Sequence, residues 1–168
     1  MVRLGFVSLI ALLGISRGLS AQVHDDFSGT WKMDAARSES AHQDVPTGSS
    51  TVTIQPTGTG ITMETIRSEG GKPFHETLNL KVDGTETTSV GDGGGIVTGK
   101  AHWDGAKLVV ETARSIQDST VTTLYVHTLS ANGREMTIDK TLTVQHGYQG
   151  VSAPTTGHGK DVFTRVAK

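Results

Sequence analysis

Three short turn signals constrain the fold of this chain more than any other feature. Asp83-Gly84, Asp104-Gly105 and Asn132-Gly133 each lie between runs rich in Thr, Val, Ile and Leu. Two-residue hairpin turns need positive φ angles, which Gly tolerates and Asn or Asp accept. No helical period persists for more than a turn or two between them. The pattern predicts an all-β chain of antiparallel hairpins.

The runs between the turns predict an up-and-down meander of about eight to ten strands. A sheet of that size must curl or close to protect its edges, so we expect a lipocalin-like barrel that is closed or nearly closed. A two-sheet β-sandwich is the alternative. The expected strands cover residues 28–34, 50–55, 60–67, 74–82, 85–90, 96–103, 107–114, 120–130, 135–145 and 161–166.

Three segments interrupt the strand pattern. Ala35 to Ser49 is rich in Ser and Ala, and Gln145 to Lys160 contains four glycines and a proline, so both predict long loops. Gly91 to Gly95 predicts a flexible hairpin turn or bulge, because a phosphate-binding loop would need a Lys-Ser/Thr ending and a following helix.

The first 21 residues have the composition of a cleaved secretory signal. Arg3 precedes an apolar run from Leu4 to Ile15, and small residues up to Ala21 offer a cleavage site. The run is shorter than the about 20 residues that a membrane-spanning helix needs. We expect a secreted or periplasmic protein with one domain, residues 22–168, and no stable membrane anchor. An N-terminal helix of the domain is the alternative.

The net charge and the absence of cysteine exclude several classes of partner and of chemistry. Two of the 15 basic residues lie in the signal, which leaves the mature chain with a net charge of −4 and argues against nucleic acid as a partner. The chain has no cysteine, so a disulfide, a thiol nucleophile and a lipidated cysteine are all excluded. We expect a monomer that is stabilised by its core alone.

Side chains alternate between the two faces of a strand, and this alternation predicts the inner face. In the strand from residue 135, the face of Met136 and Ile138 also carries Lys140; in the strand from Phe74, the apolar face carries Glu76. A charge on an apolar face is costly unless it is paired. Glu76 and Lys140 therefore predict either an internal ion pair or groups that meet a polar ligand. Alternatively, they lie at the barrel mouth and extend into water.

Most of the other expected inward residues are small or medium in size, which leaves room for a cavity, although a flattened and well-packed barrel fits equally. Those residues are Trp31, Met33, Val52, Ile54, Ile61, Met63, Trp103, Leu108, Val110, Tyr125 and Val162.

Motifs for catalysis or metal binding are weak. The seven histidines form no His-x-His pair, although a site assembled from His75, His102 and His127 on different strands stays open. There is no Gly-x-Ser-x-Gly motif and no paired carboxylates on one face. If the protein were an enzyme, the polar cluster that could carry its chemistry would be His146, Tyr148 and His158 in the late loop, although solvation of the loop explains these residues as well. We expect no enzyme, metal or cofactor.

The start of the predicted domain, Asp26-Phe27-Ser28-Gly29-Thr30-Trp31-Lys32, resembles the Gly-x-Trp opening of the calycins, the lipocalin and fatty-acid-binding β-barrels. The resemblance implies that Trp31 lies at the barrel floor and that Arg165 packs across it. The helices of fatty-acid-binding proteins, the lipocalin C-terminal helix and the usual lipocalin cysteines have no counterpart here. Ligand-binding residues outside the motif are therefore not transferred.

These observations predict an exported barrel that binds a small hydrophobic or amphipathic ligand, with Lys140 as an anion anchor. The alternative is a protein-binding module, an envelope adaptor or an inhibitor, that uses the loop of residues 145–160. The expected ligand-binding residues are Trp31, Phe74, Glu76, Leu78, Leu80, Trp103, Tyr125, Met136, Ile138 and Lys140.

Overall fold

The protein is a nearly closed, antiparallel β-barrel. The computed structural model describes residues 24–41, 48–69, 72–91, 94–147 and 153–167, so the expected signal of residues 1–21 lies outside the described part. No helix in those ranges is long and apolar enough to cross a membrane. The elements are β1 (Gly29–Met33), η1 (Ala35–Arg37), β2 (Ser50–Pro56), β3 (Gly60–Glu69), β4 (Lys72–Lys81), β5 (Thr87–Val90), β6 (Ile96–Asp104), β7 (Lys107–Ile116), β8 (Ser119–Leu129), β9 (Glu135–His146) and β10 (Thr155–Arg165).

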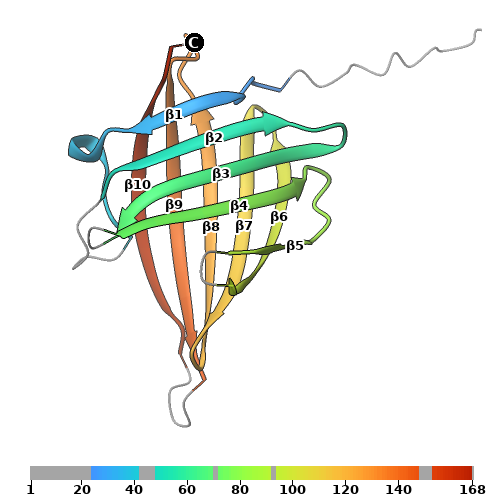
Figure 1. Ribbon diagram of the computed structural model, residues 1–168, viewed down its shortest axis with the longest axis vertical. Helices are drawn as coiled ribbons and strands as arrows, with labels where there is room; N and C mark the ends of the chain where they lie inside the picture. The colour runs from blue at the N-terminus through green and yellow to red at the C-terminus, as the bar shows by residue number, and fades with distance from the viewer. Residues whose placement is uncertain (1–23, 42–47, 70–71, 92–93, 148–152, 168) are drawn as a thin grey trace, which may run out of the picture.

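All ten strands belong to one sheet, in the order β4-β3-β2-β1-β10-β9-β8-β7-β6-β5. Every strand pairs antiparallel with its neighbours, so the predicted all-β meander is confirmed and the chain does not form a two-sheet sandwich. In Figure 1, β1 to β4 run across the front of the molecule, while β7 to β10 stand steeply behind them and extend further down. This extension leaves part of the inner face uncovered by β1 to β4.

The barrel closes at a seam between β4 and β5, the two ends of the sheet order. The Asn79 backbone N–H donates to Ser89 Oγ at 3.4 Å across this seam. Leu80 on β4 packs over Gly99 on β6, where an added Cβ would lie 2.5 Å from Leu80 Cδ2. Side chains therefore join the two edges of the sheet at this seam.

Asp104-Gly105 and Asn132-Gly133 lie at turns between paired strands, the first with a shift of one position. The hairpin predicted at Asp83-Gly84 is wrong, because β4 and β5 are the two ends of the sheet order and this segment contacts β6 instead, where the Gly84 N–H donates to the Ala101 carbonyl at 2.8 Å. Asp104 pairs with Lys107, so the turn residues are Gly105 and Ala106, one position later than predicted. A further tight hairpin, which the sequence pattern did not predict, places Gln117 at a φ of 51° between β7 and β8. Positive φ values are also found at Gly84 (82°), Gly105 (60°) and Gly133 (64°).

The prediction of a long loop over Gln145 to Lys160 is wrong. β9 runs to His146 and β10 begins at Thr155. Gly157 and Gly159 are packing positions, because a Cβ at Gly159 would lie 2.5 Å from the Ala41 backbone nitrogen and one at Gly157 would lie 2.2 Å from the Ala41 carbonyl oxygen. The segment after β1 pairs with β10 there, through Glu39 and Lys160. Tyr148 lies outside the described residues, and so do residues 42–47 of the first predicted loop.

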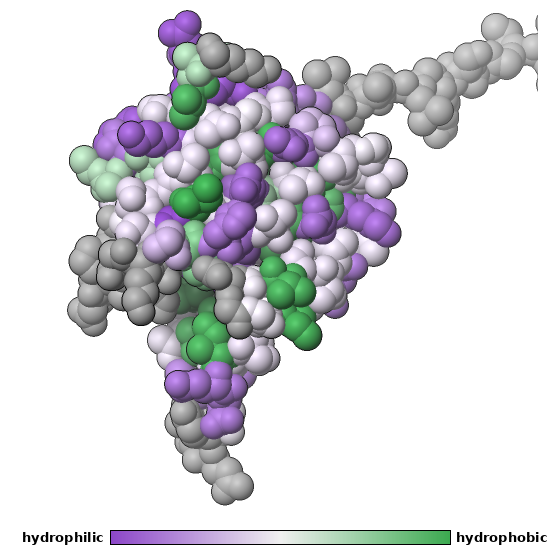
Figure 2. Space-filling model, in the orientation of Figure 1, coloured by the Kyte–Doolittle hydropathy of each residue, from purple (hydrophilic) through white to green (hydrophobic). Residues whose placement is uncertain are grey.

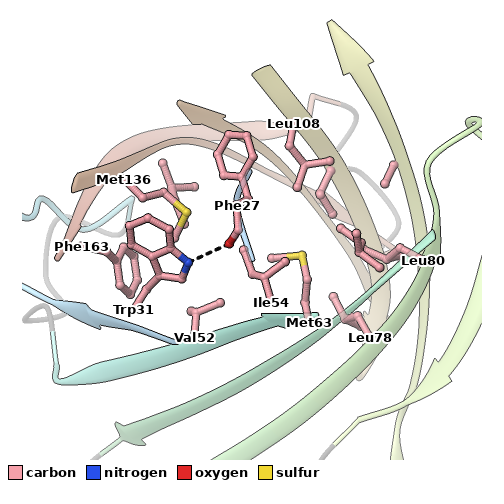
Figure 3. Close-up of a cluster of buried hydrophobic side chains, with 14 of the residues drawn as sticks. Phe27, Trp31, Val52, Ile54, Met63, Leu78, Leu80, Leu108, Met136 and Phe163 are labelled. Carbon is pink, nitrogen blue, oxygen red and sulfur yellow. Dashed lines mark hydrogen bonds between the residues drawn. The ribbon is translucent and has the colours of Figure 1, made fainter. Parts of the chain in front are cut away.

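The floor of the barrel is built around Trp31, which is fully buried (Figure 3). Its Nε1–H donates to the Phe27 carbonyl at 2.9 Å, so the segment before β1 folds back over the indole. The Arg165 guanidinium lies 4.1 Å from the centre of the Trp31 ring, as the calycin resemblance implied. Arg165 also donates to the carbonyls of Gly133 (2.8 Å), Asp26 (2.8 Å) and Ser28.

The apolar core adjoins this floor, and most of the predicted inward residues belong to it. Val162 is a correction: it is buried against the segment after β1, where its N–H donates to Ser38 Oγ, and its neighbours Asp161 and Phe163 share the inward face with Met136. The buried apolar residues that form one cluster are Phe27, Trp31, Val52, Ile54, Ile61, Met63, Leu78, Leu80, Val97, Ala101, Leu108, Val110, Met136, Ile138 and Phe163.

Replacing Arg165 by lysine tests the floor. Lysine cannot donate to three carbonyls in a fixed fork or stack a planar group on the indole, so we expect Arg165→Lys to lower the free energy of unfolding by about 2 kcal/mol. Urea titration monitored by tryptophan fluorescence measures the change. The exposed Arg134→Lys is the matched control, for which we expect a change within about 0.5 kcal/mol. Equal effects of the two replacements would contradict the assigned role of Arg165.

Candidate functional site

The inner face of the barrel divides into a closed core and an open half. On β9, Met136 and Ile138 are buried in the core, whereas Leu142 and Val144, further along the same face, are only half-buried. Val121 on β8 pairs with Val144 and is also half-buried. Solvent therefore reaches apolar side chains that point inward. Figure 2 shows a recess below the position of β4, with hydrophobic side chains at its back and lower edge.

The predicted ligand-binding residues fall into both parts. Phe74 and Lys140 are half-buried in the open half, Tyr125 is half-buried and packs against the core, and Glu76 is buried at the boundary between the two parts. Trp103 lies toward the floor, where the His24 ring stacks on it at 4.3 Å. The other five form part of the closed core, with exposed fractions of 0 to 8%: Trp31, Leu78, Leu80, Met136 and Ile138.

Glu76 pairs with Arg114, and Lys140 has a different partner. Arg114 Nη2 on β7 lies 3.0 Å from Glu76 Oε1 and 3.2 Å from Oε2. The two side chains are 22% and 8% exposed, so this ion pair reaches across the seam between β4 and β5 in a sparsely hydrated place. The ion pair suggested between Glu76 and Lys140 is therefore wrong, because Glu76 pairs with Arg114 and Lys140 pairs with Asp161.

Lys140 pairs with Asp161 on the wall formed by β9 and β10. Its Nζ donates to Asp161 Oδ1 at 2.6 Å, from β9 to the adjacent β10. Burial raises the pKa of the Asp161 carboxyl above its usual value, and the hydrogen bond from Lys140 opposes that rise. The pair is 17% and 10% exposed on its two side chains. The two charges are therefore only weakly hydrated.

A third cation completes the set that we call the ion-pair belt: Arg67, Glu76, Arg114, Lys140 and Asp161. The Arg67 guanidinium lies 3.8 Å from the centre of the Phe74 ring, to which it is matched across β3 and β4. The belt lies between the apolar core and the half-buried residues of the open half.

Three residues of the belt were not identified from the sequence: Arg67, Arg114 and Asp161. Arg114 follows Leu108 at an even spacing along β7, so the two side chains share a face. Asp161 on β10 and Arg67 on β3 have the same phase as buried apolar residues of their own strands. Strand alternation alone would have placed Arg114 and Arg67 inward, whereas the adjacent apolar residues Val162 and Phe163 leave the phase at Asp161 undecided.

The three histidines that the sequence left open as a metal site differ in their exposure and in their contacts. His75 is exposed and lies 2.7 Å from Glu64 Oε1, His102 is exposed, and His127 is buried. Across the described ranges, no three His, Asp or Glu side chains are grouped so as to hold a metal ion. His146 contacts Ser119 on the inner face and His158 contacts Thr141 on the outer face, so these two do not form one polar cluster.

His127 is the most strongly perturbed titrating group of the described interior. It is 1% exposed, and its Nδ1–H donates to the Leu108 carbonyl at 3.0 Å. Burial lowers its pKa to about 4, against which this hydrogen bond acts weakly. His127 is therefore neutral near pH 7 and serves the core beside Phe27, whose ring meets it edge-on at 6.3 Å.

Comparison with known proteins defines the class of the fold. No family model matches the sequence, and no curated protein matches it. An abundant heat soluble (SAHS) protein from Ramazzottius varieornatus has a similar structure, with a TM-score of 0.56 and 17% identity over 86% of this chain and 98% of that chain. A fatty acid transporter designated REP1-NXSQ gives a TM-score of 0.52 and 12% identity, over 84% and 96%. The fold of this chain is a calycin-like β-barrel, and at these identities the likeness concerns the fold alone.

Acid should destabilise the protein through His127. The folded pKa of about 4 lies below the ordinary 6.5, so the unfolded chain binds the extra proton between these values. Above pH 6.5, neutral His127 therefore contributes about 3 kcal/mol to the free energy of unfolding, and this contribution is lost as the pH falls toward 4. Urea titrations from pH 4 to 7 should show this loss in the wild type and lack it in His127→Gln. His102→Gln, at an exposed histidine, should keep the wild-type dependence; an unchanged dependence in His127→Gln would assign the loss to other groups.

Proposed function

We propose that this protein is a non-catalytic carrier that binds a small hydrophobic or amphipathic molecule in the open half of the barrel. The observation that carries the proposal is the presence of half-buried apolar side chains, Leu142, Val144 and Val121, on the inward face beside charged inward groups. An apolar surface next to a few oriented polar groups is the usual composition of a small-molecule site.

The energetics favour an occupant of modest size. Each buried CH₂ group contributes about 0.8 kcal/mol, so a short alkyl chain or a ring system along β8 and β9 gains several kcal/mol. The closed core below the ion-pair belt has no exposed fraction above 9% among its clustered residues, so the ligand stays above the belt. One of the solved structures with the same fold is that of a fatty acid transporter, which supports a carrier role.

A matched pair of substitutions on β9 tests the site. Leu142 faces inward and its neighbour Thr143 faces outward, and both are half-buried. We expect Leu142→Glu to weaken binding of the neutral fluorescent probe N-phenyl-1-naphthylamine by at least about tenfold, because it places a charge against the apolar part of the ligand. Thr143→Glu should change the affinity by less than about twofold. Fluorescence titration gives both constants, and thermal unfolding confirms that both variants fold.

Equal effects of the two substitutions, or unchanged binding in Leu142→Glu, would place any probe site elsewhere. Leu142→Phe supplies a second inward variant that adds volume without a charge.

We also propose that the protein is exported and that residues 1–21 are removed. The support is the order of Arg3, the apolar run from Leu4 to Ile15, and the small residues before Gln22. Intact mass measurement of protein from the periplasm or medium of its own host should give a chain that begins at Gln22. Recovery of the uncleaved chain from the cytoplasm alone would reject export. Native mass spectrometry of the same sample would show a retained ligand as added mass.

A further inference from the structure

We infer that the open half of the barrel selects amphiphiles with a neutral polar head, such as an alcohol, an ester or an amide, over those with a carboxylate or sulfonate. Glu76 and Asp161 are the residues that set this preference. The inference rests on the proposed ligand site and goes against the anion anchor that the sequence suggested for Lys140.

Two inward cations are already matched by carboxylates from other strands. Arg114 Nη2 donates to Glu76 Oε2 at 3.2 Å and lies 3.0 Å from Oε1, across the seam. Lys140 holds Asp161 at 2.6 Å on the wall of β9 and β10. The protein thus supplies its own anions at the level where a ligand head would lie.

An incoming anion would meet unfavourable electrostatics there. To pair with Lys140 or Arg114 it must displace Asp161 or Glu76, or lie beside the carboxylate. The carboxylate side chains are only 10% and 8% exposed, so a displaced one would lose its partner without gaining full hydration. A head without charge avoids this cost.

Hydroxyl groups next to the belt suit a neutral head. Tyr125 is paired with Lys140 across β8 and β9, and Thr123 is paired with Thr112 across β7 and β8. All three hydroxyl residues lie on the inward face, and a phenol or threonine hydroxyl can both donate and accept a hydrogen bond. Tyr125 is half-buried whereas Thr123 and Thr112 are 9% and 3% exposed, so an alcohol or amide head can exchange hydrogen bonds with the Tyr125 hydroxyl while both ion pairs stay intact.

Arg67 is the remaining cation of the belt, and its guanidinium is held against the Phe74 ring at 3.8 Å. The stack places the planar group on an aromatic face at the rim, where a cation is favoured by the ring quadrupole. Stacking leaves the N–H groups in the guanidinium plane able to donate, so Arg67→Met is included in the test below to determine whether Arg67 binds the head.

Two dyes that differ by one sulfonate test the preference. N-phenyl-1-naphthylamine is neutral and 8-anilinonaphthalene-1-sulfonate carries the anion on the same ring system. In the wild type we expect the neutral dye to bind at least about tenfold more tightly than the sulfonate in fluorescence titrations. Glu76→Gln frees Arg114 and Asp161→Asn frees Lys140, so each should move the ratio toward the sulfonate by at least about tenfold.

Controls separate this effect from a general loss of structure. Glu64→Gln removes a carboxylate that contacts His75 on the outer face and should leave the ratio unchanged. Asp161→Asn does not touch the seam, so it preserves the test if Glu76→Gln unfolds the barrel. Thermal unfolding is measured for each variant.

Each outcome decides a different point. Sulfonate binding that equals or exceeds neutral binding in the wild type, or ratios unmoved by the folded variants, overturns the neutral-head inference while the ligand site stands. Tight sulfonate binding that Arg67→Met abolishes would move the head to Arg67 and also overturn it. If neither dye binds the wild type, the proposed ligand site itself is rejected, and the inference with it.

Discussion

The contact between Arg165 and Trp31 is the interaction on which the rest of the structure depends. It joins the first strand to the last, and the same guanidinium holds the carbonyls of the segment before β1 and of the turn before β9. Because Trp31 in turn holds Phe27, the floor is closed by side chains from both ends of the chain. The meander can therefore curve into a barrel with one end sealed and the other open.

That asymmetry has electrostatic consequences. The sealed end accepts apolar residues and a neutral His127, whereas charges on the inner face gather where the closed core ends. Each of the two ion pairs joins different strands, and one of them spans the seam between β4 and β5. The same groups thus help to hold the sheet edges together and set the polarity of the open half.

Much of the fold could be predicted because strand signals are local. The turn at Asn132-Gly133, the alternation after Met136 and the Gly-x-Trp start each depend on neighbouring residues, and each was confirmed. The late glycines misled the prediction, because Gly159 is required by a backbone that passes close to it and not by a loop. Sequence spacing does not show which distant segment approaches a glycine.

By itself, the sequence determined the all-β class, the order of the hairpins and the inward direction of Glu76 and Lys140, because turn chemistry and alternation act within a few residues. Only the tertiary structure decided what those charges meet. Partner choice depends on strand register and on where the sheet closes, which brought Arg114 from β7 to Glu76 and Asp161 from β10 to Lys140. The division of the inner face into core and open half was settled in the same way, by how far β7 to β10 extend beyond β1 to β4.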